Sequence, residues 1–500
     1  MALTTIPLWR MVFDQGAVTH DVLQHQYPGS GTDDDPYRIS WIANDSRNPL
    51  EFRTGSRWAI CGLASIATLT LALGSSTYSG GMEQIREEFH TSQEVALLGI
   101  SMWVLGFALG PMVWAPLSEV YGRRPISILS SLGLTIFTAG SVGAKNIQTL
   151  VILRFFAGSL GSSPMAVSGS IIADTFPPVI RGLGSNIYAV AAFIGPTLGP
   201  IVGSYLASAA GWRWDQGLLA IAAGILLLIN IICLPETFGP VLLHARAARL
   251  SSLTGQHYIP LSFTNNNKKI SLKSKLQIAL ARPFSLLIHE PIVLFLSLYS
   301  AIIYGILYLF FAAYPIVFHS NPLPFLAILI GNIISIALTI PTFYSYRRKA
   351  LSSPSSSPLP PETRLPPSFL GAILLPISLF WFAFTANNVD NNPMVTAAAG
   401  LPFGFAIVSV YMPILSYLID TYGPRYAASA IAVNALLRSL FGAVFPLFTP
   451  VMYARLGVTW ASAVPAFLAL ACVPLPFVFW AFGDRVRRRC RFAGGGGKSG

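Results

Sequence analysis

Charged residues and cysteines are scarce in this sequence of 500 residues. Asp, Glu, Lys and Arg make up only 10% of it, whereas a soluble globular protein carries about a quarter. So few charges indicate that most of the chain lies in lipid. The four cysteines, Cys61, Cys233, Cys472 and Cys490, show neither the spacing of a metal site nor a disulfide pattern. We therefore expect no bound metal and no disulfide framework.

The motifs of several large protein classes are also missing. The sequence has no cluster of histidines, no nucleophile motif and no phosphate-binding loop of the form GxxxxGKS or GxxxxGKT. A membrane enzyme and an ATP-driven pump are therefore disfavoured, and no cofactor is expected. The first residues lack a basic stretch followed by a cleavable apolar run, so we expect no secretory signal peptide.

Apolar residues are abundant and fall into long runs. They make up 53% of the sequence, and the mean hydropathy is +0.60. A helix that crosses a bilayer needs roughly 20 mostly apolar residues. Twelve segments meet this requirement, which predicts an all-α integral membrane protein with twelve transmembrane helices. The predicted spans are 58–79, 94–116, 126–144, 149–173, 183–207, 215–235, 291–313, 323–344, 368–386, 396–419, 427–449 and 459–482.

Polar stretches divide these spans into two groups of six. We predict a polar N-terminal tail over 1–57, a six-helix bundle over 58–235, a central loop over 236–290, a second six-helix bundle over 291–482 and a basic tail over 483–500. The acidic run at the middle of the N-terminal tail, Asp33 to Asp35, is expected to be solvated chain rather than a site.

Basic residues are distributed unevenly over the loops. If the N-terminus is cytoplasmic, 21 of the 32 Lys and Arg residues fall in inner loops and the C-terminal tail, and four fall in outer loops. Cytoplasmic loops of membrane proteins carry such an excess. The bias places both termini in the cytoplasm and accounts for the net charge of +12. The expected partner is therefore a lipid bilayer and no nucleic acid.

A charged turn joins the second and third predicted spans, within the sequence GPMVWAPLSEVYGRRP at 110–125. Glu119 ends an apolar run, Gly122 permits a sharp reversal, and Arg123 and Arg124 hold the turn on the cytoplasmic side. In a protein of many membrane hairpins, such a turn is a place where helices can be locked together and released. The turn therefore points to a transporter.

Three glycines recur every four residues in the fifth predicted span. Gly195, Gly199 and Gly203 share one helix face, which lets another helix approach closely. Pro196 and Pro200 add local kinks between them. Generic packing of small residues and a specific role in exchange would use the same contact, and the two prolines favour the exchange role.

Two arginines lie deep within predicted spans, Arg154 in the fourth and Arg438 in the eleventh. An unpaired charge in hydrocarbon costs several kcal/mol, so each is expected to face a bundle interior. Asn434 lies one turn before Arg438 and either lines a cavity or bonds across helices. Tyr304 is one of several aromatic residues that either line a cavity or pack in the core. These four residues are the candidates for proton coupling or for the cavity wall.

Four segments resemble the major facilitator superfamily, and more narrowly its fungal branch of twelve-span drug:proton antiporters. They are APLSEVYGRRP at 115–125, FIGPTLGPIVGSYL at 193–206, LPETFGPVLLHARAAR at 234–249 and YLIDTYGPRYAASAIAVNALLRSLFGAVF at 417–445. The resemblance covers nearly the whole chain. It implies two six-helix bundles around a central cavity that opens alternately to the two sides of the membrane.

The resemblance also implies roles for particular residues. Glu119 is expected to meet the N-terminus of the eleventh span, near Gly423 to Tyr426, where the helix dipole favours negative charge and the contact holds the outward-facing state. Arg123 is expected to pair with Asp174. The glycine face of the fifth span is expected to pack on the eighth span and to resist proton leak. Arg154 is expected to take part in proton coupling.

The expected function is the export of drugs, toxins or secondary metabolites from the plasma membrane by a monomeric, proton-driven transporter. Relatives commonly have an acid where this chain has Ala312, and the acids Asp215 and Glu290 lie toward span ends, so the sequence identifies no proton carrier. It identifies no particular substrate either. Two alternatives stay open: a nutrient importer or facilitator of the same fold, and a non-transporting membrane sensor or inactive relative.

The predicted topology can be tested at Asn44. The sequence Asn44-Asp45-Ser46 is the single Asn-x-Ser/Thr glycosylation signal of the chain, and it lies in the tail that we place in the cytoplasm. We expect Asn44 to carry no glycan when the protein is produced in a eukaryotic host. Treatment with a glycosidase followed by a gel-mobility comparison checks this, and a glycan on Asn44 would overturn the topology.

Overall fold

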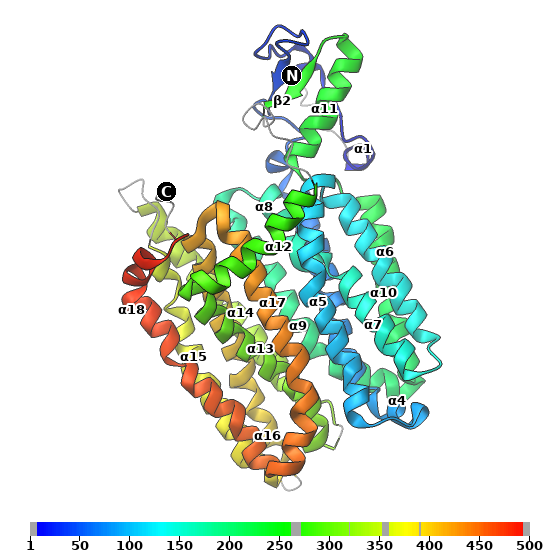
Figure 1. Ribbon diagram of the computed structural model, residues 1–500, viewed down its shortest axis with the longest axis vertical. Coiled ribbons are helices and arrows are strands. Elements are labelled where there is room, and N and C mark those ends of the chain that lie inside the picture. Colours follow the sequence, from blue (N-terminus) through cyan, green and yellow to red (C-terminus); the bar gives the residue numbers. More distant parts are fainter. Residues whose placement is uncertain (1–7, 262–271, 320, 353–359, 390–391, 494–500) are drawn as a thin grey trace.

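Long helices run side by side through the main body of the molecule, and a small cap stands on one end of it (Figure 1). We call the end of the helical body that bears the cap the cap face. The opposite end, near α4 (Met82–Phe89) and α16 (Pro393–Ala398), is the far face. The computed structural model describes residues 8–261, 272–319, 321–352, 360–389 and 392–493.

The first bundle contains six membrane-crossing segments, each built from one of the long apolar runs. Side-chain caps mark some helix starts: Asn146 Oδ1 accepts a hydrogen bond from Thr149 N (2.8 Å) where α7 begins. The fourth segment consists of two helices, because α8 begins at Ser163, with Pro164 in its first turn, just after α7 ends. The elements are α3 (Thr54–Ser76), η2 (Thr77–Ser79), α4, α5 (Gln93–Tyr121), α6 (Arg123–Val142), α7 (Ile147–Gly161), α8 (Ser163–Thr175), α9 (Pro178–Ala210) and α10 (Trp212–Cys233).

The second bundle contributes six further segments, three of them within α17. The backbone of α17 leaves the helical conformation at Gly423 (φ 58°) and Gly457 (φ 72°), in a region that favours glycine. Eleven helices in the described ranges are long and apolar enough to cross a membrane, and Ser429–Arg489 contains the break at Gly457 and so counts as two. The predicted all-α fold with twelve spans is therefore confirmed. The elements are α13 (Pro291–Val317), α14 (Phe325–Ser352), η4 (Pro361–Arg364), α15 (Pro367–Thr385), η5 (Ala386–Asn388), α16, α17 (Gly400–Cys472) and α18 (Pro474–Arg489).

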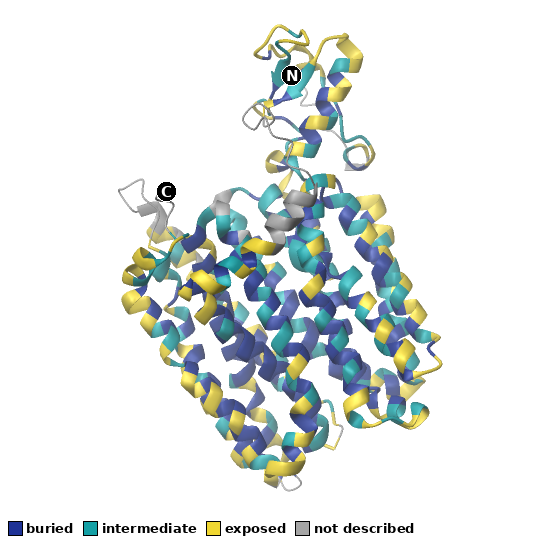
Figure 2. Cartoon of the chain, viewed as in Figure 1, coloured by how far each residue is buried: buried dark blue, intermediate teal, exposed yellow. Residues whose placement is uncertain are grey.

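Apolar side chains face outward along the perimeter of the body, as helices in lipid require. On α10, Ile221, Ile225, Leu228 and Ile232 recur every three or four residues, and each is 53–59% exposed. Buried residues instead fill the centre of the body, and exposed residues lie along its outer helices (Figure 2). Helix α13 is buried along most of its length because α17 packs beside it.

The cap forms where the N-terminal tail packs on the first part of the central loop. Strands β1 and β2 pair in parallel, with Tyr37 opposite Tyr258, and a small apolar core lies beneath them. The acidic run expected to be solvated chain lies next to β1; Asp33 Oδ1 lies 2.7 Å from His257 Nδ1, and Asp35 Oδ1 lies 3.7 Å from Arg38 Nη2. The cap elements are α1 (Leu8–Phe13), α2 (His20–Gln24), β1 (Tyr37–Ile39), η1 (Pro49–Glu51), α11 (Gly239–Thr254) and β2 (Tyr258–Pro260), and α12 (Leu272–His289) then leads to the second bundle.

A buried ion pair joins the two parts of the cap. Asp45 accepts hydrogen bonds from Arg246 at 2.5 Å and 3.0 Å, and both side chains are 1% exposed. Nearby, Arg47 donates to the backbone oxygens of Glu236 and Met11, each at 3.2 Å. Burial lowers the pKa of Arg47 to about 10, so the side chain stays charged at neutral pH. The cap is thereby fastened to the segment that follows α10.

Candidate functional site

The charged turn between α5 and α6 is a single-residue reversal on the cap face. Gly122 (φ 98°) ends α5 and begins α6. A side chain is excluded here, because a Cβ on Gly122 would collide with the carboxylate of Glu236, and because this φ strains any other residue. Arg124 leaves the turn toward α10, where its Nη2 donates to Ile231 O (2.9 Å).

Arg123 points from this turn into the first bundle and is 7% exposed. Its Nε lies 3.1 Å from Asp174 Oδ2 at the end of α8, and its Nη1 donates to Ser118 Oγ on α5 (2.6 Å). The guanidinium also lies over the Phe238 ring, 4.6 Å from its centroid. The structure thus brings Arg123 and Asp174 together, and this contact joins α5, α6 and α8.

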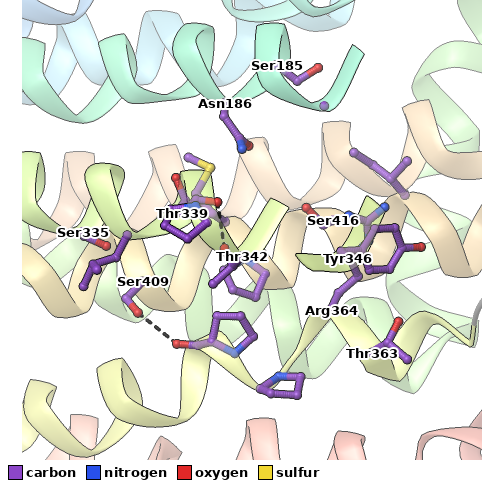
Figure 3. A pocket seen from close by; sticks show the side chains of 18 of the residues that line it. Ser185, Asn186, Ser335, Thr339, Thr342, Tyr346, Thr363, Arg364, Ser409 and Ser416 are labelled. Carbon is purple, nitrogen blue, oxygen red and sulfur yellow. Dashed lines mark hydrogen bonds between the residues drawn. The ribbon is translucent and has the colours of Figure 1, made fainter. Parts of the chain in front are cut away.

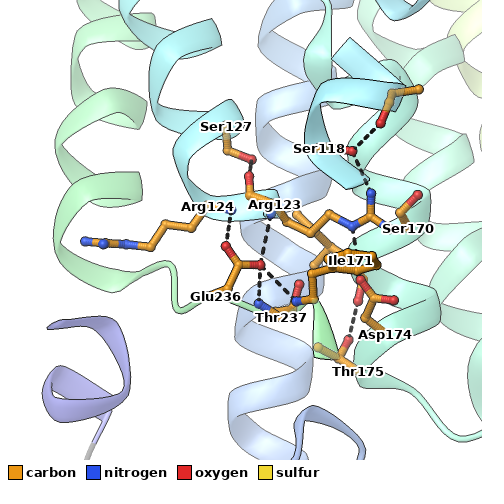
Figure 4. Close-up of polar contacts among 12 residues, drawn as sticks. Ser118, Arg123, Arg124, Ser127, Ser170, Ile171, Asp174, Thr175, Glu236 and Thr237 are labelled. Atoms are coloured by element: carbon orange, nitrogen blue, oxygen red, sulfur yellow. Dashed lines mark hydrogen bonds and ion pairs between the residues drawn. The ribbon is translucent and has the colours of Figure 1, made fainter. Parts of the chain in front are cut away.

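Glu236 follows α10 in the sequence and contacts this turn, and sequence reasoning missed it. It is fully buried, and its carboxylate accepts hydrogen bonds from the backbone N–H groups of Arg123 (2.9 Å), Arg124 (3.1 Å), Thr237 (2.9 Å) and Phe238 (2.8 Å) (Figure 4). Two of these donors belong to the first turn of α6, where free N–H groups and the helix dipole favour a carboxylate. Its place in the LPETFGPVLLHARAAR segment is the signal that the sequence offers.

Glu119 lies near the end of α5 with an exposed side chain. The helix start expected to receive it follows Gly423, and the side chains of Pro424 and Arg425 lie outside the described residues. The predicted contact across the bundles therefore stays a prediction.

The glycine face of α9 packs closely on α3 and η2. A Cβ on Gly195 would lie 2.6 Å from Ala72 Cβ, and a Cβ on Gly199 would lie 2.8 Å from Thr77 N. A Cβ on Gly203 would collide with the backbone of Thr77 as well. All three glycines are therefore needed for one contact between the first and fifth spans.

The prediction that this glycine face packs on the eighth span is wrong. Helix α14 does pack on α9, but on another face, where Asn332 Nδ2 donates to Thr197 Oγ1 (3.4 Å). Thr197 lies two residues from both Gly195 and Gly199. Its side chain therefore points about 200° around the helix axis from the glycine face, toward the opposite side of α9. Pro196 and Pro200 lie inside α9 without ending the helix.

Arg154 is completely buried in the first bundle, and each nitrogen of its guanidinium has a partner. Nε donates to Gly99 O (2.7 Å), Nη2 to Gly74 O (2.9 Å) and Nη1 to Gln216 Oε1 (2.9 Å). The guanidinium also lies 4.5 Å from the centroid of the Tyr78 ring. Arg154 thereby joins α7 to α3, α5 and α10.

Asp215, which precedes Gln216 on α10, is a buried acid on the far-face side of the first bundle. It is 1% exposed, and neither of its carboxylate oxygens has a hydrogen-bond partner among the described residues. Its Oδ2 lies close to Gly81, where a Cβ would be 2.8 Å away. Arg154 is the charged group that acts on it through space. The structure therefore supplies a buried acid where the sequence suggested only a residue near a span end.

Arg438 occupies a different kind of site, at the interface of the two bundles. It is 7% exposed, and its guanidinium lies 4.7 Å and 4.9 Å from the ring centroids of Tyr304 and Tyr411. Neither amide atom of Asn434, which is 1% exposed, has a partner among the described residues. Three of the four predicted candidates, Tyr304, Asn434 and Arg438, thus lie together, whereas Arg154 lies within the first bundle.

A pocket of about 670 Å³ lies between the bundles in the cap-face half of the body. Asn186 points into it from α9, across from residues of the second bundle (Figure 3). Arg364 and Asp420, which both line the pocket, form an ion pair with 2.7 Å between Arg364 Nε and Asp420 Oδ2. Hydroxyl groups and apolar side chains line most of the remainder, which suits an amphipathic molecule. Lining residues include Ser185, Ser335, Leu338, Thr339, Thr342, Phe405, Ser409, Met412 and Ser416.

Two direct contacts between the bundles lie deeper in the body than the pocket. Ser75 Oγ lies 2.7 Å from Tyr308 OH, which joins α3 to α13. The Phe193 ring of α9 packs edge-on against Tyr411, with 5.0 Å between the ring centroids. The pocket therefore lies on the cap-face side of these contacts.

Comparison with known proteins agrees with this architecture. The sequence model of the Major Facilitator Superfamily matches residues 64–446 of this chain. The MFS-type efflux pump MFS2 of Trichophyton rubrum is 49% identical over 98% of this chain and 83% of its own length. The major facilitator superfamily multidrug transporter mdrA of Aspergillus fumigatus is 47% identical over 98% of this chain and 81% of its own length.

The arrangement of helices also resembles solved structures. The inward-open conformation of the xylose transporter XylE from E. coli superimposes with a TM-score of 0.62, over 85% of this chain and 96% of that one. The sequences are only 17% identical, so this likeness concerns the fold.

Gly199→Val tests whether the close contact of α9 with α3 is required. A valine would be driven into Ser76 and Thr77, and overpacking of this kind typically costs about 1–3 kcal/mol. We expect a lower melting temperature and severely reduced transport by a protein that still reaches the membrane. Gly62→Val in α3 is the control, since a Cβ there meets nothing within 4 Å. Equal transport rates for both variants would show that the contact is dispensable.

Proposed function

The chain belongs to the major facilitator superfamily, and on that premise we propose that it exports small amphipathic molecules in exchange for protons. It is a membrane transporter rather than an enzyme. Two relatives that are nearly half identical to it carry the names efflux pump and multidrug transporter, which supports export as the direction. We place the protein, as a monomer, in the plasma membrane with both termini in the cytoplasm.

The observation that carries the proton part of the proposal is the environment of Asp215. An acid that has lost water and has no hydrogen-bond donor is disfavoured in its charged form, so it is suited to hold a proton. Arg154 is close enough to act on its charge, and Arg154 is held in place by three hydrogen bonds. A proton can therefore be held or released at Asp215 as the surroundings of Arg154 change during transport.

Alternating access supplies the second part of the proposal. In this structure the pocket lies on the cap-face side of the contacts of Ser75 with Tyr308 and of Phe193 with Tyr411, which corresponds to an inward-facing state if the cap is cytoplasmic. We propose that in the outward-facing state Glu119 meets the start of the eleventh span and holds the cap face closed. Arg123, Asp174 and Glu236 would keep the turn that carries Glu119 in position.

Glu119→Lys tests this latch. A carboxylate stabilises a partly buried helix N-terminus by up to about 2 kcal/mol. Loss of this stabilisation would change the ratio of the outward-facing to the inward-facing state about thirtyfold. We expect Glu119→Lys to favour the inward-facing state, so that a cysteine placed at Ser185 in the pocket reacts faster with a thiol reagent and transport falls. Glu119→Asp keeps the charge and is the tolerated control. If Glu119→Lys leaves both the reactivity of the cysteine and the transport rate unchanged, the proposed contact of Glu119 with the eleventh span is wrong.

Asp215→Asn tests the proton carrier. Purified protein in vesicles is given a gradient of about one pH unit, worth about 1.4 kcal/mol for each exchanged proton or about a tenfold gradient of substrate. We expect Asp215→Asn to lose this pH-driven accumulation but to retain exchange of labelled for unlabelled substrate. Glu83→Gln, an exposed acid on the far face, should behave like the native protein. Native pH-driven accumulation in Asp215→Asn would contradict the assignment.

The same vesicles separate the proposal from its alternatives. A proton-driven nutrient importer would move substrate in the same direction as the protons, whereas the proposed exporter moves it in the opposite direction. A sensor or inactive relative would bind substrate without moving it in either direction.

A further inference from the structure

Arg154 and Arg438, two of the buried arginines, differ in how their charge is satisfied. Arg154 donates from all three nitrogens and has the acid Asp215 within electrostatic reach. Arg438 makes no hydrogen bond and no ion pair to any described residue, and its Nε is buried without a partner. Its stabilisation comes from the faces of two tyrosine rings. A buried cation without an anion is unfavourable, and none of the described residues supplies a negative charge to this site, so an anionic ligand would stabilise it.

A second polar group beside Arg438 is unsatisfied as well. Asn434 precedes Arg438 by four residues, so the two side chains share one face of α17. Both atoms of the Asn434 amide are buried without a partner in the described part of the chain. An amide N–H and a guanidinium on one helix face form a donor pair that matches the two oxygens of a carboxylate.

Aromatic rings surround these donors from both bundles. Tyr304 and Tyr411 flank Arg438 from the second bundle, and Phe193 of α9 packs edge-on against both tyrosines. Tyr188, also on α9, lies in the neighbourhood of Arg438. The surroundings are therefore formed by aromatic rings, with a single positive charge among them. Such a site fits a molecule with an aromatic or apolar skeleton that ends in a carboxylic acid.

The site adjoins the pocket on two helices. Met412 lines the pocket directly after Tyr411, and Ser185 and Asn186 line it within one turn of Tyr188. A molecule that enters the pocket from the cap face therefore has only a short distance to reach the aromatic rings. A change in how α9 meets α17 would open the way to Arg438, and such a change is what alternating access requires.

We propose that Arg438 and Asn434 bind the carboxylate of the transported molecule, so that the substrates include amphipathic organic acids. This inference rests on the proposed export function and adds its substrate class. At neutral pH a carboxylic acid is ionised, because its pKa is about 4. Arg438 would then gain the anion that no described residue provides, and the aromatic rings would hold the apolar part of the molecule.

A matched pair of probes tests the proposal: 1-naphthoate, which has a carboxylate, and 1-naphthamide, which has the same ring system without the charge. Binding of each to the purified full-length protein is measured by calorimetry at neutral pH. We expect 1-naphthoate to bind at least about tenfold more tightly, equivalent to about 1.4 kcal/mol, because hydrogen bonds to charged groups contribute about that much. Equal affinities for the two probes would overturn the proposal.

Variants of Arg438 locate the preference. Arg438→Gln should bind both probes equally, Arg438→Lys should keep part of the preference for 1-naphthoate, and Asn434→Leu should reduce it. Arg455→Gln, at an exposed arginine on the same helix, is the matched control and should bind like the native protein. Size-exclusion profiles show which variants are folded. A native preference in folded Arg438→Gln would place the carboxylate elsewhere and end the proposal.

The outcome can be separated from that of the proposed function. Rhodamine 6G, an amphipathic cation, is offered to the native protein in vesicles with a pH gradient. If the gradient drives rhodamine transport and the two naphthalene probes bind equally, the substrate class is wrong and proton-driven export stands. If 1-naphthoate binds with the expected preference but the gradient moves neither 1-naphthoate nor rhodamine, the binding site stands and proton-driven export is wrong.

Discussion

A charge inside an apolar body needs a partner, and the interior of this protein is organised around that requirement. Arg154 is satisfied by two backbone carbonyl groups and a glutamine, so it fastens four helices of the first bundle together. Among the described residues, Asp215 has no hydrogen-bond donor, and Arg438 has aromatic faces but no anion. Asp215 and Arg438 are therefore suited to ligands that come and go, and we propose a proton for Asp215 and a carboxylate for Arg438.

Each bundle also has a buried glutamate that accepts backbone N–H groups at the cap face. Glu236 binds the N–H groups of Arg123 and Arg124 at the start of α6. Glu290 precedes α13 and binds the N–H groups of Arg491 and Phe492, which follow α18. The backbone oxygen of Glu236 in turn receives Arg47 from the cap. The cap, the charged turn and the first bundle are therefore connected through one residue.

Close packing complements these polar contacts. The glycines of α9 bring its backbone against α3, which leaves another face of α9 for α14 of the second bundle. The fifth span can therefore be held tightly within its own bundle, while its contact with the described residues of the other bundle consists of one long hydrogen bond and packed side chains. Such a division allows the bundles to move relative to each other, because the tight contact is internal to the first bundle.

The sequence alone determined the membrane class, the twelve spans and the charged turn, because these follow from the length of apolar runs and from local turn chemistry. It also pointed to Arg154 and Arg438, since a charge in an apolar run is visible without a structure. The partner of the glycine face, the anchoring role of Glu236 and the burial of Asp215 were decided by tertiary structure. Each depends on which residues from distant segments meet, and a helix with several small or polar positions does not specify which of its faces meets which neighbour. Only the folded chain shows that Arg154 has a partner for each guanidinium nitrogen, and that Arg438 meets two tyrosine rings but no anion among the described residues.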